Sequence, residues 1–254
     1  VVLTSCVPET IGDDVAAVCA EHPAADRIVY IPTSGFLGGS AKDGENAALA
    51  ALGKRAPLMD PVPGTVAIVG EKNLESEADE NYAEIERLLL RLGLRVVVRF
   101  CRNADAAALL QLGSASCFIL RDDRAAAAGM ELAKRFQRPL VSEFPRGLSG
   151  CIRFLQETGK ACGISNEMST AAVRAEEVFQ EQMLREFSEL YRKRIRFGVE
   201  PFDGTLTVAR EAANRLGLCE CPDGCLIRLP FYLPVGTAGI RKMLFIWRRA
   251  VRNG

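Results

Sequence analysis

The stretch Thr65-Val-Ala-Ile-Val-Gly70 decides the fold class, because a short, wholly apolar run that ends in glycine is typical of a strand buried on both faces of a parallel sheet. Strands and helices alternate after it. The pattern predicts helices over residues 77–92, 104–112, 125–136 and 148–158, and strands over residues 95–100, 116–120 and 140–144. This alternation predicts an α/β fold, a Rossmann-like doubly wound parallel sheet with helices on both faces. Ligands of such sheets bind beyond the carboxyl ends of the strands.

The chain on either side of this sheet predicts further units. Residues 54–63 contain three prolines and are expected to form a linker, preceded by a helix over residues 45–52 and a strand over residues 27–32. A charged, amphipathic helix over residues 166–194 is expected to connect domains. We therefore predict domains at 1–58, 59–165 and 195–254, joined by the helix 166–194. The last part holds a strand at 195–199 and helices at 205–216 and 240–252, too little for an independent doubly wound domain, so it is truncated or completed by other sequence or by a partner.

Composition excludes several function classes. With 254 residues and 48% hydrophobic content, the chain can bury the cores of about two domains. The formal net charge of +0 argues against nucleic acid or an anionic membrane as a partner. No apolar run approaches the ~20 residues of a membrane span, and the first residues show no signal-peptide pattern. Nine scattered cysteines favour free thiols in a reducing cytoplasm. The one histidine, His22, is expected in a solvated turn.

A second informative stretch is Leu3-Thr-Ser-Cys-Val-Pro-Glu-Thr-Ile-Gly-Asp-Asp14. It predicts the end of a buried strand, a turn that contains Cys6, and a helix over residues 9–20. Helix N-terminal amides favour the thiolate form of a nearby cysteine, and thiolates bind soft metals and iron–sulfur clusters. The residues alone leave a second interpretation open, in which Cys6 is a small packed side chain at a strand end.

A glycine-rich loop is predicted between Thr33 and Gly44. Glycine-rich turns before helices can hold phosphate through backbone amides, but this loop has neither a P-loop lysine nor the G-x-G-x-x-G spacing of dinucleotide sites. What remains is a position where a bulky group or another backbone approaches closely.

Other candidates stay open. Cys219, Cys221 and Cys225 form C-x-C-x3-C in a turn-prone segment, either a metal site or three incidental thiols. Cys101 follows a predicted strand, where a ligand could sit, or belongs to the core. Residues 121–124, Arg-Asp-Asp-Arg, place charge at the carboxyl edge of the sheet, for an anionic substrate or a partner surface, or merely cap a helix.

Taken together, these stretches resemble a known family. Cys6 followed by Ile11-Gly-Asp-Asp14, the loop Gly35-Phe-Leu-Gly-Gly-Ser40 with Gly44, the strand ending in Gly70 and the helix closed by Gly93 are similar to nitrogenase component 1-type oxidoreductases. That family includes nitrogenase catalytic-component subunits, cofactor scaffold subunits and nitrogenase-like reductases. The resemblance covers roughly residues 1 to 217, with a weaker echo at Pro234 to Gly239.

The resemblance implies site residues and partners. Cys6 would ligate an iron–sulfur cluster shared at the interface with a homologous sister subunit. Gly35, Gly38, Ser40 and Gly44 would lie beside that cluster, with Ser40 as an accessory oxygen ligand. Because a cubane cluster takes about four protein ligands, the others must come from a second chain and from sequence before Val1.

The expected function is a subunit of a nitrogenase-like two-component reductase, which receives electrons from an ATP-dependent iron protein. The alternatives are a cofactor-assembly scaffold subunit and a cluster-free structural partner. The family's cofactor-anchoring cysteine would fall near Leu120 or Arg121, where this chain has no thiol, and its anchoring histidine has no counterpart. Dinitrogen reduction by this chain as the cofactor-bearing subunit is therefore not expected.

Overall fold

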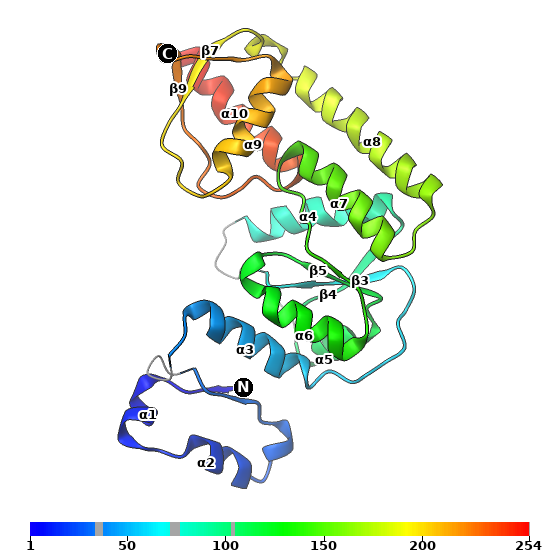
Figure 1. The fold of residues 1–254 in the computed structure, drawn as a ribbon, viewed down its shortest axis with the longest axis vertical. Helices are drawn as coiled ribbons and strands as arrows, with labels where there is room; N and C mark the ends of the chain where they lie inside the picture. The colour runs from blue at the N-terminus through cyan, green and yellow to red at the C-terminus, as the bar shows by residue number, and fades with distance from the viewer. Residues whose placement is uncertain (34–37, 72–76, 103–104, 254) are drawn as a thin grey trace. The chain divides into compact units, whose positions relative to one another are not determined.

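A computed structural model describes residues 1–33, 38–71, 77–102 and 105–253. The chain forms two compact units, each made of two segments (Figure 1). Unit 1 comprises Val1–Lys72 and Val96–Ser142, and unit 2 comprises Asn73–Arg95 and Glu143–Gly254. The predicted division at 1–58, 59–165, 166–194 and 195–254 stays a prediction, and each unit is described by itself below.

Unit 1 is an α/β body with a small N-terminal extension. Its strands are β1 (Val2–Leu3), β2 (Tyr30–Ile31), β3 (Thr65–Val69), β4 (Arg95–Arg99, with Arg95 at the unit boundary), β5 (Cys117–Leu120) and β6 (Leu140–Val141). Its helices are α1 (Cys6–Ile11), α2 (Val15–Glu21), α3 (Ala41–Gly53), α5 (Ala106–Leu110) and α6 (Ala126–Phe136), with short 3-10 turns at Ala25–Arg27, Gln111–Ser114 and Asp123–Ala125.

The main sheet has four strands in the order β4-β3-β5-β6. In chain order, this sheet begins with β3. The next strand, β4, lies on one side of β3, and β5 and β6 follow on the other side, which is the doubly wound topology. β3 and β5 pair in parallel with Val66 opposite Cys117, and β5 and β6 pair in parallel with Phe118 opposite Leu140. The predicted α/β, Rossmann-like fold is confirmed.

One face of this sheet forms the core of unit 1 with α3 and α6, which pack against each other. All five residues of β3 are buried, as the apolar run predicted. Gly53 lets the two helices pack closely, because a Cβ there would lie 2.2 Å from Leu132 Cδ2 and the leucine side chain would have to shift. The proline-rich segment before β3 is tied to the same body: the Val62 amide donates to the Ser114 carbonyl (2.8 Å) and Arg138 donates to the Met59 carbonyl (3.0 Å).

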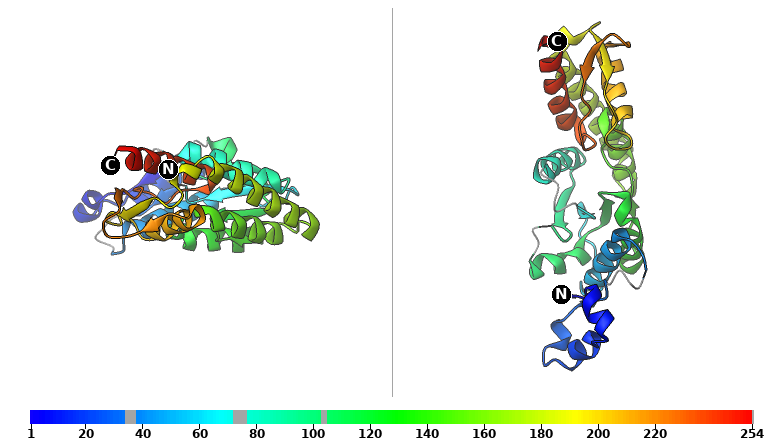
Figure 2. Two further views of the ribbon diagram at one scale, coloured as in Figure 1. Left: turned by 90° about the horizontal axis from the view of Figure 1, so that it is seen from above. Right: turned by 90° about the vertical axis from the view of Figure 1, so that its left-hand side faces the viewer.

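Unit 2 is mostly helical, with a second, smaller parallel sheet. Its helices are α4 (Ala78–Arg91), α7 (Gly147–Ala161), α8 (Asn166–Arg185), α9 (Thr205–Leu216) and α10 (Gly236–Asn253), with a 3-10 turn at Ser188–Leu190. Its strands are β7 (Arg194–Phe197), β8 (Cys219–Glu220) and β9 (Cys225–Ile227), in the order β8-β7-β9. Figure 2 shows α10, in red, beside β9. Its core gathers around the fully buried Trp247 and Phe187.

Several predicted boundaries are correct and others are wrong. The predictions for β3, α4, α6 and α9 agree with the structure within a residue or two, and Gly93 and Gly217 end their helices in the left-handed region as expected. The predicted helix over residues 9–20 is wrong, because Gly12 (φ 79°) breaks it into α1 and α2. The predicted helix over residues 166–194 ends at Arg185, and the strand over residues 27–32 shortens to Tyr30–Ile31.

Candidate functional site

The candidate site is built on the two-strand pair β1–β2 of unit 1. The strands run parallel, with Val2 opposite Tyr30 and Leu3 opposite Ile31. Beyond their carboxyl ends, the Thr33 amide donates to Thr4 Oγ1 (3.3 Å) and the Thr33 hydroxyl donates to the Thr4 carbonyl (2.5 Å). Because parallel strands end at the same edge, this pair brings together the segment that leads into α1, which begins at Cys6, and the start of the glycine-rich loop at Thr33.

Cys6 is the first residue of α1 and is half-buried. Ser5 before it is extended (ψ −179°), and the Thr10 hydroxyl donates to the Cys6 carbonyl (2.7 Å). The helix then stops: the Gly12 amide donates to the Pro8 carbonyl, and Asp14 begins α2 by accepting from the Ala17 amide (2.9 Å). The Ile11-Gly-Asp-Asp14 motif is thus a helix stop followed by a helix start. The strand before it is less buried than predicted, since Leu3 is 59% exposed.

The glycine-rich segment leads directly into α3. Gly35 lies outside the described residues. Gly38 (φ 81°) and Gly39 (φ 97°) are both left-handed, which favours glycine at each. Ser40 is the N-cap of α3, and the Asp43 carboxylate accepts from both the Ser40 amide (2.7 Å) and the Ser40 hydroxyl (2.8 Å). Gly44 was predicted in the loop, and this is wrong: it lies in the first turn of α3, because the capping residues start the helix earlier.

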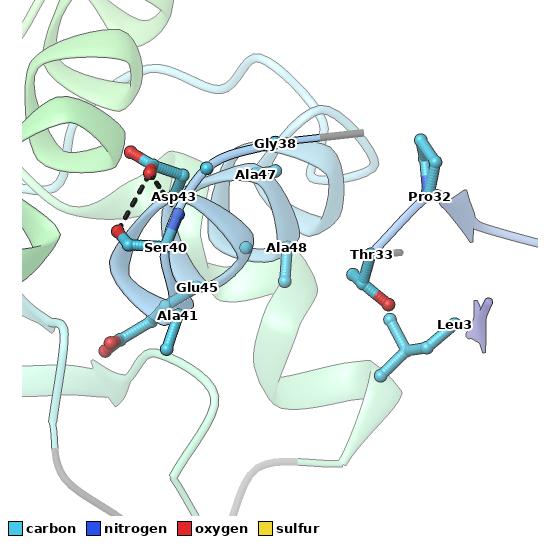
Figure 3. A pocket seen from close by; sticks show the side chains of 12 residues that line it. Leu3, Pro32, Thr33, Gly38, Ser40, Ala41, Asp43, Glu45, Ala47 and Ala48 are labelled. Atoms are coloured by element: carbon cyan, nitrogen blue, oxygen red, sulfur yellow. Dashed lines mark hydrogen bonds between the residues drawn. The ribbon is translucent and has the colours of Figure 1, made fainter. Parts of the chain in front are cut away.

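A pocket of about 520 Å³ separates the strand pair from α3. Figure 3 shows Leu3, Pro32 and Thr33 on one side, and Ser40, Asp43 and Ala48 on the other. Three of the predicted site residues, Gly38, Ser40 and Gly44, line it, whereas Cys6 does not. No atom beyond its immediate chain neighbours and helix backbone lies within 4 Å of a Cβ placed on Gly38 or Gly44, so the space beside both glycines is open.

Two carboxylates, Asp43 and Glu45, line the pocket, and hydrogen bonds to Ser40 fix the position of Asp43. Hydrogen bonds from the Ser40 backbone and then the Ser40 side chain lower the pKa of Asp43 below the usual aspartate value. The Asp43 carboxylate therefore stays ionised, and its Oδ2 atom accepts a hydrogen bond from the Ser40 hydroxyl. The Ser40 oxygen keeps its lone pairs as acceptors, and Ser40 lines the pocket together with the apolar residues Leu3, Ala47 and Ala48.

The described residues do not complete a metal site on their own. Within residues 1–33, 38–71, 77–102 and 105–253, no group of three or more histidine, cysteine, aspartate or glutamate side chains is arranged to hold a metal ion. A cubane cluster takes about four protein ligands. Cys6 supplies one thiol to this region, so a cluster here would need ligands from elsewhere.

The other cysteines divide into buried thiols and surface thiols, and all nine are free. Burial raises the pKa of Cys101 to about 11, which disfavours the thiolate that a ligand role requires. Cys117 is buried in β5, and Cys151 donates to the Gly147 carbonyl (3.1 Å). Near the end of the chain, Cys221 accepts from Arg194 (3.3 Å) and Cys225 donates to the Ala250 carbonyl (3.4 Å). The role of Cys219, Cys221 and Cys225 stays open.

Two sequence alternatives resolve in favour of local structure. Asp122 caps a 3-10 turn by accepting from the Arg124 amide (2.9 Å), as the capping interpretation of residues 121–124 predicted. His22 is exposed and accepts from the Ala24 amide through Nδ1 (3.0 Å), so it has the predicted place in a turn. Sequence reasoning did not find Thr4 and Thr33, whose mutual hydrogen bonds join the two parts of the site; neither residue belongs to a recognisable motif.

Comparisons with known proteins agree with this architecture. The family model of nitrogenase component 1 type oxidoreductases matches residues 1–217. The nitrogenase iron-molybdenum cofactor biosynthesis protein NifE of Sinorhizobium fredii (strain NBRC 101917 / NGR234) is 34% identical over 110 residues, which are 41% of this chain and 21% of that protein. Two solved structures, of nitrogenase Cp1 at pH 6.5 and at pH 5, superpose with a TM-score of 0.63 each, at 17% and 16% identity. They cover 86% and 94% of this chain.

The chain therefore belongs to the nitrogenase component 1 type oxidoreductase family, as the sequence resemblance predicted. It spans 21% of the biosynthesis protein, and 43% and 52% of the two solved chains. At these identities the solved structures support the shared fold alone. Within the part of the chain that the structure describes, no helix is long and apolar enough to cross a membrane.

Proposed function

We propose that this chain is a subunit of a nitrogenase-like two-component reductase, in which Cys6 supplies one thiolate to an iron–sulfur cluster shared with a homologous sister subunit. Electrons would come from an ATP-dependent iron protein. The observation that carries the proposal is the parallel β1–β2 pair, whose joined ends at Thr4 and Thr33 lead on one side to Cys6 and on the other to the glycine-rich segment. Family membership supports it.

The fit between the described residues and a cluster is partial. One half-buried thiol at a helix start is suited to metal ligation, but the remaining thiolates must come from the sister subunit or from sequence before Val1. We therefore assign no step of the reaction to the cluster. What this chain contributes is a ligand from Cys6 and, in a pocket that Cys6 does not line, open space at Gly38 and Gly44 and the Ser40 oxygen, into which a bulky group or a neighbouring backbone fits. Our proposal places these three residues beside the cluster. Gly35 shares this proposed role.

A second candidate function is a scaffold subunit that holds a cluster during cofactor assembly. The observation that favours it is the 34% identity to a protein named for iron-molybdenum cofactor biosynthesis. Both candidates use Cys6 in the same way and place the protein in the cytoplasm, where the nine free thiols would stay reduced.

Iron analysis tests the ligand role. The chain is purified anaerobically together with its sister subunit, as wild type, as Cys6→Ala and as Cys19→Ala, and iron content and the electron paramagnetic resonance spectrum are measured. Cys19 is a matched control, because it is also half-buried and lies on the next helix, α2. We expect Cys6→Ala to lose the cluster signal and Cys19→Ala to keep it. Unchanged iron content and an unchanged spectrum in Cys6→Ala would show that Cys6 is not a cluster ligand.

Turnover separates the two cluster-binding functions. The loaded complex is mixed with the cognate iron protein and ATP, and consumption of reductant is followed together with cluster content. A reductase oxidises reductant over many cycles and keeps its cluster. A scaffold shows no sustained turnover and loses its cluster to an added apo-acceptor protein.

A further inference from the structure

Unit 2 contains one short motif twice. Pro145-Arg-Gly-Leu-Ser-Gly150 precedes and opens α7, and Pro234-Val-Gly-Thr-Ala-Gly239 precedes and opens α10. The first glycine of each copy is left-handed, with φ 74° at Gly147 and φ 66° at Gly236. In both copies the second glycine packs on the motif's own proline, with a Cβ at Gly150 or Gly239 lying 3.4 Å or 3.1 Å from the proline carbonyl carbon.

The two copies bind each other through equivalent atoms. Arg146 and Val235, the second residues of the two copies, form an isolated antiparallel bridge. The Gly147 amide donates to the Pro234 carbonyl (3.2 Å), and the Gly236 amide donates to the Pro145 carbonyl (2.7 Å). An exchange in which each copy gives and receives the same bond is what an approximate two-fold axis between them produces.

Two glutamates make further hydrogen bonds to the two copies, at the starts of α7 and α10. Glu211 of α9 accepts from the amides of Leu148 (3.1 Å) and Ser149 (2.7 Å) at the start of α7. Glu84 of α4 accepts from the Ala238 amide (3.1 Å) at the start of α10. Ser149 and Ala238 occupy the same position of the motif, and each glutamate is the seventh residue of its helix, counted from Thr205 and from Ala78.

The glycines leave space for these carboxylates. A Cβ at Gly147 would lie 2.7 Å from Glu211 Oε2, and a Cβ at Gly236 would lie 2.1 Å from Glu84 Cγ. The order of the two parallel sheets repeats in the same way: β7 lies between β8 and β9, the next two strands of the chain, as β3 lies between β4 and β5.

We propose that Glu84 and Glu211 are equivalent positioning residues that interlock two helix pairs of unit 2, α4 with α7 and α9 with α10. Each pair lends the other a carboxylate, and unpaired amides at a helix start need such an acceptor. Neither helix start is complete within its own pair. The interlock is a conformational device of unit 2 and does not depend on the proposed cluster.

The two halves of the interlock differ in support. Arg87 donates to both Glu84 oxygens (2.7 and 2.8 Å), whereas the equivalent residue of α9, one helical turn after Glu211, is Asn214. Glu84 is buried and Glu211 is half-buried. Glu211 is therefore the better residue to change. Substitution of Glu84 would remove the carboxylate that pairs with Arg87, whereas Asn214 at the equivalent position carries no charge.

Amide hydrogen exchange in the whole chain tests the interlock. In Glu211→Ala we expect faster exchange, by about fivefold or more, at Leu148 and Ser149, because a lost helix cap weakens the first turn by that factor. The interlock further requires faster exchange at Gly236 and Ala238, whose amides donate to the Pro145 carbonyl and to Glu84 instead. The amides of β7 serve as the internal reference for global stability, and Glu181→Ala, an exposed change on α8, serves as the control.

The outcomes are separable. Faster exchange at both motif copies, with β7 and the Glu181→Ala control unchanged, supports the interlock. Faster exchange confined to Leu148 and Ser149 overturns it, since Glu211 would then be an ordinary local cap. If Glu211→Ala does not fold, Glu211→Gln keeps the side-chain shape and removes the charge, and the same two amide pairs decide the result.

Discussion

Glu176 of unit 2 is a buried carboxylate whose charge is balanced by neighbouring side chains. Its side chain is fully buried on α8 and accepts from Arg87 (2.7 and 2.8 Å), Arg91 (3.0 Å) and the Thr237 hydroxyl (2.6 Å). Burial lowers the pKa of Arg87, but its hydrogen bonds to Glu84 and Glu176 more than offset this and raise the pKa above its ordinary value. The guanidinium therefore stays charged, and Glu176 is the carboxylate that it shares with Arg91.

Removal of this carboxylate should be strongly destabilising. Glu176→Ala leaves two partly buried guanidiniums without their shared partner, and we expect the free energy of unfolding to fall by about 3 kcal/mol. Denaturant unfolding of the variant measures it. Glu181→Ala, exposed on the same helix, is the control and should change the free energy by less than about 0.5 kcal/mol. Equal effects of the two substitutions would show that the network contributes nothing.

Asp43 should give α3 a pH-dependent start. Because the Ser40 hydrogen bonds lower its folded-state pKa below the usual 3.8, its contribution is complete above that value and is lost as pH falls through the lowered pKa. NMR titration of the Asp43 carboxyl should give a midpoint below 3.8, and Ser40→Ala should move it upward, since one of the two donors is gone. A midpoint that Ser40→Ala leaves in place would contradict the assignment of the hydroxyl as a donor.

At the scale of elements, long periodic segments were predictable and short ones were not. β3, α4 and α9 carry continuous apolar runs or one-sided apolar faces, and these patterns directly reflect burial. In the sequence, the break at Gly12 is indicated only by a glycine followed by Asp13 and Asp14, which end one helix and begin the next. The prediction followed the apolar periodicity across this signal and was therefore wrong. The two-residue strands β1 and β2 have no period to detect, so the pairing that assembles the candidate site could not be predicted.

A pair of glycine substitutions tests the two helices of the site. Gly12→Ala places a side chain at φ 79° and should weaken the α1–α2 connection by about 1 kcal/mol. Gly44→Ala lies in the first turn of α3 with open space around it, so it should stabilise this chain alone by about 0.5 kcal/mol. Thermal unfolding measures both signs. If Gly44 faces a sister subunit, the same Gly44→Ala substitution should also weaken co-purification of the two chains, and unaffected assembly would place Gly44 outside the interface.

At the scale of the whole molecule, the family and fold class followed from sequence, but the two units did not. Unit 2 takes α4 from the middle of the alternating region and joins it to residues after Glu143, and contacts between such distant segments leave no local pattern. The same holds for the Pro-x-Gly-x-x-Gly repeat: both copies are printed in the sequence, while the reciprocal bonds between them exist only in the folded chain. The predicted four-part division of this chain therefore stays a prediction.

The helices α1 and α2 in the N-terminal part of unit 1 expose several large apolar side chains. Val7, Ile11 and Val18 on α1 and α2 are 64%, 67% and 68% exposed, and α2 buries none of its residues. Three exposed apolar side chains on two consecutive helices favour an interaction site here, and the proposed sister subunit is the partner that a shared cluster requires. Residues 1–33 should therefore lie in that interface.

A charge in this surface should break the assembly without unfolding the chain. Ile11→Lys needs no repacking because the side chain is exposed, so the unfolding midpoint should stay constant. A buried lysine in the interface should weaken the complex by about tenfold or more, and iron should be lost with the partner. Val178→Lys, a 52% exposed valine on α8, is the matched control. Co-purification measures assembly. Retention of the sister subunit and of iron by Ile11→Lys would remove α1 from the interface, and Cys6 with it.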